Sequence, residues 1–104
     1  MAVPILRPGD TNDAVPRMKR ALVRELLKLG LRAVAEGVVL DSKTYGAAAV
    51  NAVEKFQARK HLQVNGIVGK DTWHALGVDE PVVDDAGRVV MAPGASSPAG
   101  RFSA

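Results

Sequence analysis

The sequence predicts a mainly α protein, a small three-helix bundle followed by a C-terminal arm that can form a β-hairpin and a flexible tail. Its 104 residues are the length of one small domain. Apolar residues make up 47% and charged residues 24% of the chain, close to the globular averages of about 45–50% and about 25%. Three segments repeat apolar residues at helical spacing. With no cysteine in the sequence, packing alone must stabilise the fold.

The first helix is expected at residues 13–29, after an extended lead-in. Pro4, Pro8 and Gly9 interrupt any helical period in residues 1–12. Gly30 then stands where a helix ends. On a helical wheel, apolar and basic residues take opposite sides. The apolar side holds Val15, Met18, Leu22, Leu26 and Leu29, and the basic stripe holds Arg17, Arg20, Arg24 and Lys28.

Two more helices are expected, at residues 44–60 and 70–76. Residues 31–43 should connect the first two helices as a brief strand or an extended loop, because Gly37 and the Asp41-Ser42 pair bracket a short apolar run. In the second helix, Gln57 lies at the edge of the apolar face. Its side chain can either satisfy backbone groups or contact a ligand.

A composition change after Gly77 separates residues 1–77, the helical domain, from residues 78–104, the arm. Within the arm, Val82-Val83 and residues 88–91 favour strands and are joined by a turn sequence. The last stretch, "GASSPAGRFSA", is small and polar, as in a linker or tail.

The sequence offers little for catalysis. His61 and His74 have no third ligand at a metal-binding spacing, and each fits a surface position at a helix end. Glu36 and Asp41 could form a carboxylate pair, but so short a chain has little material for the deep cleft that such a pair requires. We therefore expect no enzymatic activity, no metal and no cofactor.

Two aromatic side chains stand beside glycine turns, where rings can contact sugars or peptides. Trp73 lies within a predicted helix of a chain with only 4% aromatic residues, and we expect it to anchor the core. Tyr45 lies on the turn itself, so its ring could face either the core or a groove.

Three segments together resemble a known family: "LRPGDTNDAVPRMKRAL", "YGAAAVNAVEKFQ" and "VNGIVGKDTWHAL". In this order they are similar to the small three-helix peptidoglycan-binding domain of bacterial and phage cell-wall hydrolases. The resemblance runs from Leu6 to Leu76, and its last segment is the most specific. The departures cluster in the turns, where "DSKT" replaces an Asp-Gly pair, Asn65 replaces an Asp and Lys70 replaces a frequent Pro.

The resemblance implies a non-catalytic module that binds peptidoglycan, with the stem peptide as the expected ligand. Backbone donors at two helix starts would hold a carboxylate of the peptide, and Tyr45 and Ile67 would supply apolar contacts. The implied binding residues lie in the loops before the second and third helices: Asp41, Tyr45, Asn65, Gly66, Ile67 and Val68.

A different class of function is that of a structural or assembly protein, for example a component of a phage particle. Residues 78–104 would then dock onto other protein subunits through edge strands. No basic region precedes a long apolar run, so neither a signal peptide nor a membrane span is expected. The wall would be reached by lysis or on a phage particle (virion). Nucleic-acid binding through the basic stripe is a third alternative, but no exposed aromatic residues accompany the stripe.

Overall fold

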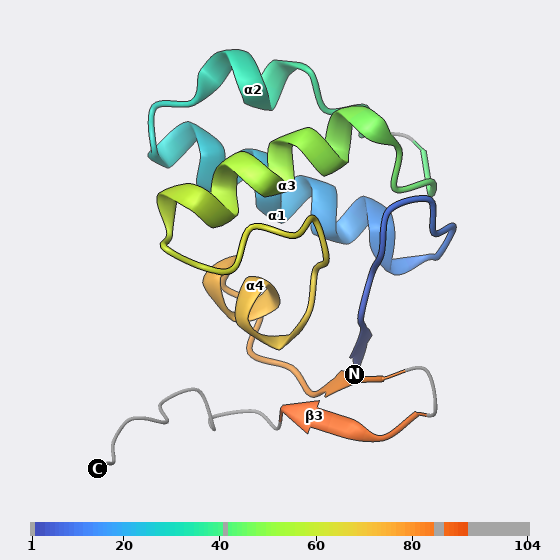
Figure 1. Ribbon diagram of the computed structural model, residues 1–104. Helices are drawn as coiled ribbons and strands as arrows, with labels where there is room; N and C mark the ends of the chain where they lie inside the picture. Colours follow the sequence, from blue (N-terminus) through green and yellow to red (C-terminus); the bar gives the residue numbers. More distant parts are fainter. Residues whose placement is uncertain (1, 41, 85–86, 92–104) are drawn as a thin grey trace, which may run out of the picture.

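The computed structural model describes residues 2–40, 42–84 and 87–91, and of Val90 and Met91 it describes the backbone only. Within these residues, four helices lie above a small sheet (Figure 1). The elements are β1 (Val3–Pro4), α1 (Ala14–Lys28), α2 (Arg32–Glu36), α3 (Ala47–Arg59), α4 (Lys70–Ala75), β2 (Val82–Val83) and β3 (Val89–Met91). The expectation of a mainly α fold is confirmed. The predicted tail falls on residues outside the described part of the chain.

Helix α1 buries the apolar side that the sequence predicts, and it packs against both α2 and α3. The helix ends at Gly30, whose φ of +78° a residue with a side chain rarely adopts. The N–H of Leu31 then donates to the carbonyl of Leu26 at 2.9 Å, and the N–H of Gly30 donates to that of Leu27 at 3.1 Å. This hydrogen-bonded ending is the Schellman motif.

Helix α2 corrects the prediction for residues 31–43, which expected a strand or an extended loop. Leu31, Val34 and Ala35 have the spacing of one helical face. Ala35 is buried, and Leu31 and Val34 pack against the core as partly buried residues. Packing on α1 thus stabilises a five-residue helix that would be marginal in isolation.

Helices α3 and α4 lie within the two ranges predicted for them. Phe56 of α3 and Trp73 of α4 are fully buried, which confirms Trp73 as a core anchor. The indole Nε1 of Trp73 donates a hydrogen bond of 2.7 Å to the carbonyl of Pro4. This contact joins α4 to the first strand.

The predicted hairpin is present, and it is part of a three-stranded sheet in the order β1-β2-β3. Strands β2 and β3 are antiparallel, whereas β1 pairs with β2 in parallel, with Val3 opposite Val82. Val78 and Val82 are buried in the same hydrophobic core as the helices. Residues 78–83 therefore pack directly on the helical part of the chain.

A buried lysine connects α1 to the loop before α3. Lys19 is only 2% exposed, and its Nζ donates to the carbonyl of Ser42 at 3.1 Å. The basic stripe of the sequence did not include this residue.

No helix in the described ranges combines the length and apolar character that a membrane span requires.

Candidate functional site

Gln57, near the C-terminal end of α3, organises the loop between α3 and α4. Its side chain is 1% exposed. The Oε1 atom accepts hydrogen bonds from the N–H groups of Asn65 and Gly66, at 3.1 and 3.0 Å. The Nε2 group donates to the carbonyl of Ile67 at 2.9 Å and to the hydroxyl of Thr72 at 3.1 Å. Of the two roles open to Gln57 in the sequence, the structure therefore shows the first, in which it satisfies backbone groups.

Asn65 and Gly66 complete the rigid loop. The Oδ1 atom of Asn65 accepts a hydrogen bond from the N–H of Ile67 at 2.9 Å, an arrangement typical of an Asx turn. Gly66 has a φ of +73°, and a Cβ atom there would lie 3.2 Å from Cγ1 of Val50. A side chain would therefore push the loop away from α3.

Tyr45 is fully buried, so of the two directions that the sequence left open for its ring, the structure shows the one toward the core. Its hydroxyl donates a hydrogen bond of 2.5 Å to the carbonyl of Gly66. Burial, together with the nearby Glu54 carboxylate, raises the pKa of Tyr45 far above its ordinary value of 10.0. The uncharged phenol thus connects the start of α3 to the Asn65–Ile67 loop through a hydrogen bond.

The lead-in turn and the start of α3 enclose an apolar surface hollow. The N–H of Gly9 donates to the carbonyl of Tyr45, and the N–H of Tyr45 donates to the carbonyl of Asp10, both at 2.8 Å. These bonds hold the turn beside α3. The result is a hollow of about 400 Å³, here called the α3 hollow, which is lined by Pro8, Gly9, Tyr45, Gly46, Ala47, Val50, Asn51 and Glu54.

One end of the α3 hollow is the N-terminus of α3. The helix begins after Gly46, and no side chain caps it. The first N–H groups of a helix have no acceptor within the helix, and here the first turn also lacks an acidic residue. Ala47 and Ala48 are exposed. This end therefore favours an anionic group, while the carboxylate of Glu54 lies elsewhere in the lining.

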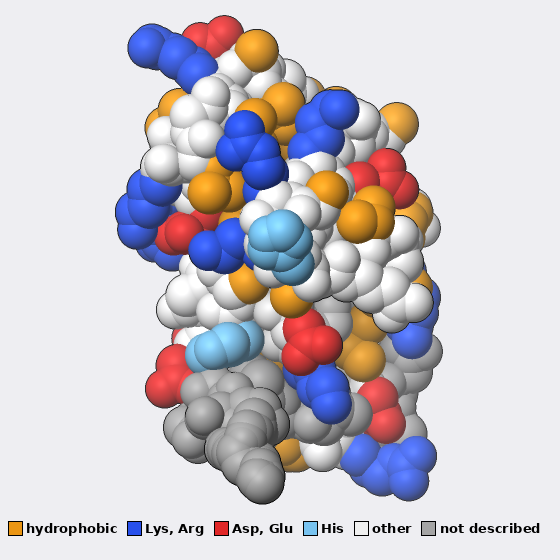
Figure 2. All heavy atoms as spheres, turned by 60° about the vertical axis from the view of Figure 1, so that its left-hand side comes forward, with side chains coloured by type: hydrophobic (Ala, Val, Ile, Leu, Met, Phe, Trp, Pro, Cys, Tyr) orange, Lys and Arg blue, Asp and Glu red, His pale blue; other side chains and the backbone are white. Residues whose placement is uncertain are grey.

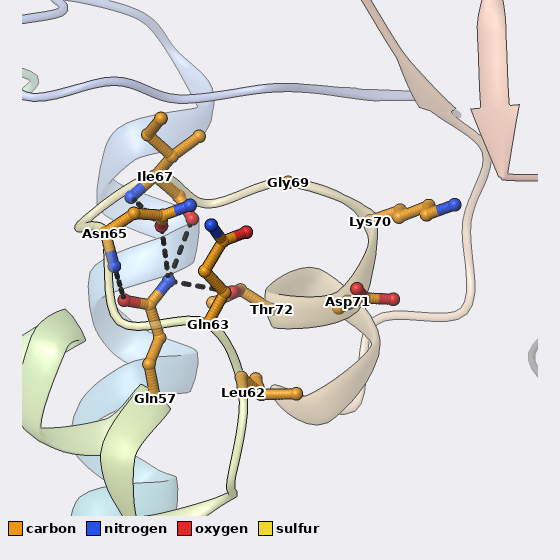
Figure 3. A pocket seen from close by; sticks show the side chains of 9 residues that line it. All are labelled: Gln57, Leu62, Gln63, Asn65, Ile67, Gly69, Lys70, Asp71 and Thr72. Carbon is orange, nitrogen blue, oxygen red and sulfur yellow. Dashed lines mark hydrogen bonds between the residues drawn. The ribbon is translucent and has the colours of Figure 1, made fainter.

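A second surface hollow is polar and lies beside the loop between α3 and α4 (Figure 3). Its volume is about 200 Å³. Gln57 lies below the loop, and Gln63 stands beside it as an exposed side chain. This polar hollow is lined by Gln57, Leu62, Gln63, Asn65, Ile67, Gly69, Lys70, Asp71 and Thr72.

The structure describes five of the six predicted binding residues, and these five do not line one groove. Tyr45 belongs to the α3 hollow, whereas Asn65 and Ile67 line the polar hollow. Gly66 and Val68 are buried, and the backbone of Val68 pairs with Leu6 through hydrogen bonds of 2.8 and 3.0 Å. Asp41 lies outside the described residues.

Several residues of the α3 hollow were not predicted from the sequence. Ala47, Val50, Asn51 and Glu54 follow the spacing i, i+3, i+4, i+7, which places them on one face of α3. This pattern was available in the sequence. What the sequence could not indicate is that the turn at Pro8 covers one edge of that face.

Three of the residues considered for catalysis, His61, His74 and Glu36, line neither hollow. His61 and His74 are exposed on the surface, where both are visible in Figure 2. Glu36 is exposed on α2, where it pairs with Arg32 at 3.2 Å. Across the residues that the structure describes, no group of three or more His, Cys, Asp or Glu side chains could hold a metal ion.

Comparison with known proteins identifies the family. Residues 12–76 match the family described as "Putative peptidoglycan binding domain". The chain belongs to this family. The match confirms the resemblance seen in the three sequence segments, and it links the chain to the bacterial cell wall. Curated proteins and solved structures contain no significant match.

The peptidoglycan-binding domain match covers all four helices. It includes the whole polar hollow and every residue of the α3 hollow except Pro8 and Gly9. The family is one of binding domains, and both hollows are shallow surface features of that domain. The three strands lie outside the matched range.

Proposed function

We propose that the chain is a non-catalytic module that binds peptidoglycan and holds a stem peptide in the α3 hollow. The observation that carries the proposal is the family match over residues 12–76, the range that forms the helical domain. The uncapped start of α3, at the end of an apolar hollow, supports this placement of the ligand.

The lining of the α3 hollow complements the chemistry of a stem peptide. Such a peptide carries carboxylates, the methyl groups of alanine and, in its diamino acid, an amino group. A carboxylate fits the N–H groups at the start of α3. The side chains of Pro8 and Val50 provide apolar contact for a methyl group, and the carboxylate of Glu54 suits an ammonium group.

The loop after α3 provides the second part of the proposed site. Tyr45 and Gln57 fix the loop from below, so the loop needs little ordering when a ligand binds. Asn65 and Ile67 then offer polar and apolar contacts along the polar hollow, while Gly66 and Val68 contribute backbone only.

The affinity for one stem peptide should be modest. Ligand pockets that bind tightly are concave and bury most of the ligand surface, whereas both hollows here are shallow. Tight attachment to the wall would require several contacts along the polymer.

A matched pair of substitutions tests the α3 hollow. Ala47 lines the hollow, and its exposed neighbour Ala48 does not. Ala47→Glu and Ala48→Glu each add one negative charge to the first turn of α3, where an acid favours the helix. Titration of a soluble muropeptide, followed by nuclear magnetic resonance, should show at least about tenfold weaker binding for Ala47→Glu. Ala48→Glu should bind like the wild type, and equal binding by both variants would contradict the placement.

The second candidate function, assembly through the C-terminal arm, has one structural observation in its favour. Strand β3 forms an edge of the sheet, and Val89 on it is 58% exposed. Open strand edges pair readily with other strands. If the chain self-associates through β3, for instance within a phage particle, Val89→Lys should abolish the association in light scattering. Val39→Lys, at a valine that is 55% exposed outside the sheet, should not, and a monomeric wild type at high concentration would refute self-association.

A further inference from the structure

A third hollow lies between α1 and the residues that follow α4. It has a volume of about 240 Å³ and is separate in lining from the two hollows of the proposed function. Arg17, Arg20 and Arg24 occur on α1 at spacings of three and four residues, which places them along one side of the helix. This arginine hollow is lined by Arg17, Arg20, Ala21, Arg24, Gly77 and Val78.

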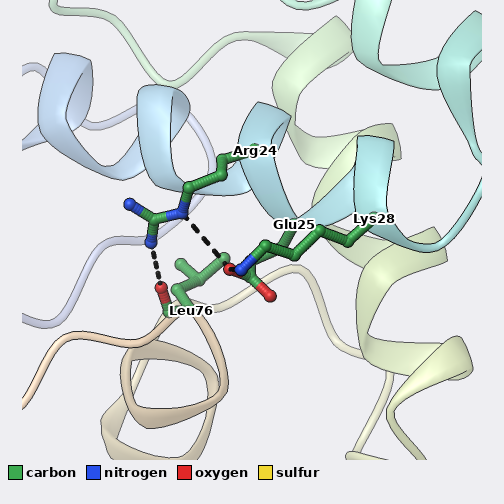
Figure 4. A network of polar contacts seen from close by, with 4 residues as sticks. All are labelled: Arg24, Glu25, Lys28 and Leu76. Atoms are coloured by element: carbon green, nitrogen blue, oxygen red, sulfur yellow. Dashed lines mark hydrogen bonds and ion pairs between the residues drawn. The ribbon is translucent and has the colours of Figure 1, made fainter.

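Two of the three guanidinium groups are held in place by the protein. Arg24 donates from Nη2 to the carbonyl of Leu76 at 2.9 Å, and its Nε lies 3.3 Å from the carboxylate of Glu25 (Figure 4). Arg17 pairs with the carboxylate of Glu80 through both terminal nitrogens. Both arginines therefore have defined positions before any ligand arrives.

Arg20 differs from its two neighbours. Its side chain is exposed, and it forms no hydrogen bond or ion pair with the described residues. It lies between two fixed arginines along α1. An anion in the hollow could therefore accept hydrogen bonds from Arg20 and from the N–H groups of Arg17 and Arg24 that are not already bonded.

The local charge also favours an anion. Arg17, Arg20, Arg24 and Lys28 contribute four positive charges, and Glu25 and Glu80 contribute two negative ones. Even with exposed Asp79 included, the group retains one positive charge. The carboxylate of Glu80 already demonstrates that an oxyanion fits against Arg17 in a forked geometry.

We propose that the arginine hollow binds a phosphate group of an anionic polymer with a phosphodiester backbone. In this proposal Arg20 donates hydrogen bonds to the phosphate. The planar fork of arginine matches the oxygens of phosphate. The two non-bridging oxygens of a phosphodiester carry its negative charge, so one can accept a hydrogen bond from Arg20 while the other accepts one from Arg17 or Arg24. Because this site has its own lining, it can bind or fail independently of the α3 hollow.

The size of the hollow favours a simple polymer over nucleic acid. From residue 17 to residue 24, α1 rises about 10 Å, which suits one or two phosphates. Single-stranded nucleic acid would also require aromatic side chains for base stacking, and Tyr45 and Trp73 are both buried. Glu25 and Glu80 interrupt any longer basic row.

Calorimetric titration of the full chain with poly(glycerol phosphate) at low salt tests the proposal. Arg20→Gln removes the exposed arginine from the hollow. Arg32→Gln makes the same charge change at an exposed position on α2, where the lost ion pair with Glu36 is also exposed and contributes little. Loss of charge-assisted hydrogen bonds should weaken the binding of Arg20→Gln about tenfold or more, whereas Arg32→Gln should stay within about twofold of the wild type.

Four results would overturn the proposal. Absence of binding by the wild type at low salt would exclude the site, and equal weakening by the two variants would indicate only diffuse charge attraction. Tighter binding of duplex DNA than of poly(glycerol phosphate), with the same loss in Arg20→Gln, would assign the hollow to nucleic acid instead. Titration with inorganic phosphate, followed at the Nε–H signal of Arg20, should move that signal if the group itself is recognised, and an unmoved signal would contradict the assignment.

Discussion

Replacing Gln57 by leucine should destabilise the protein because it removes the side chain that holds the loop between α3 and α4. Leucine has nearly the same size, so the change tests hydrogen bonding more than packing. Gln57 is 1% exposed, its Oε1 accepts hydrogen bonds from two N–H groups of the loop, and its Nε2 donates to a loop carbonyl and to the hydroxyl of Thr72 on α4. In the variant, the N–H of Gly66 and the hydroxyl of Thr72 would be buried without these partners.

The expected cost follows from these two groups. An unsatisfied buried polar group costs about 1–3 kcal/mol, so two cost about 2–6 kcal/mol. Asn65 is exposed and Ile67 is half-buried, so water can replace their bonds to Gln57. Burial of the leucine side chain offsets about 1–2 kcal/mol. At the middle of both ranges, the free energy of unfolding should therefore fall by about 2–3 kcal/mol, with a decrease in Tm of at least about 8 °C.

Urea unfolding followed by the fluorescence of Trp73 measures this change, because Trp73 is the single tryptophan and is fully buried. The matched control is Gln63→Leu, at an exposed glutamine of the same loop, which should change the free energy of unfolding by less than about 0.5 kcal/mol. If Gln57→Leu were as stable as this control, the reasoning on the loop would be refuted.

Three further predictions concern the surroundings of the loop and the sheet. Burial raises the pKa of Tyr45 above 10.0, so above about pH 10 the folded protein keeps a proton that the unfolded chain releases. The free energy of unfolding should therefore fall as the pH rises above about 10. In Tyr45→Phe, urea unfolding should show a smaller fall. Gly66→Ala should lower the free energy of unfolding by about 1–2 kcal/mol, because φ is +73° and the new Cβ would contact Val50. An unchanged Tm would argue against a fixed loop. Val82→Ala should lower the free energy of unfolding by about 2 kcal/mol through lost apolar burial. Val89→Ala, at the exposed valine of β3, should leave the Tm unchanged. Equal effects of the two substitutions would mean that β2 does not pack on the core.

Helical periodicity sufficed to predict α1, α3 and α4, because each carries an apolar face that the core buries. It did not suffice for α2, where Val38 and Val39 suggested extended structure. That five-residue helix depends on the docking of Ala35 against the core, a contact that local sequence does not specify. The parallel pairing of β1 with β2 joins residues nearly 80 positions apart, and no local signal indicates it.

The candidate site was predictable in part. The sequence placed Tyr45 on a glycine turn before α3, but the direction of its ring was beyond local sequence. Tyr45 turns inward because its hydroxyl finds the carbonyl of Gly66, 21 residues along the chain. Lys19 is similar, since its acceptor at Ser42 lies 23 residues away. Long-range partners of this kind decide which side chains remain for a ligand.

Sedimentation of the full chain with insoluble peptidoglycan sacculi, at low and at high salt, tests the central claim most directly. Binding should persist at high salt, because the α3 hollow holds its ligand through apolar contact and hydrogen bonds as well as charge. Ala47→Glu should lose this binding and Ala48→Glu should keep it. Binding that high salt abolishes, and that Ala47→Glu retains, would contradict the claim and leave only attraction to the basic surface of the protein.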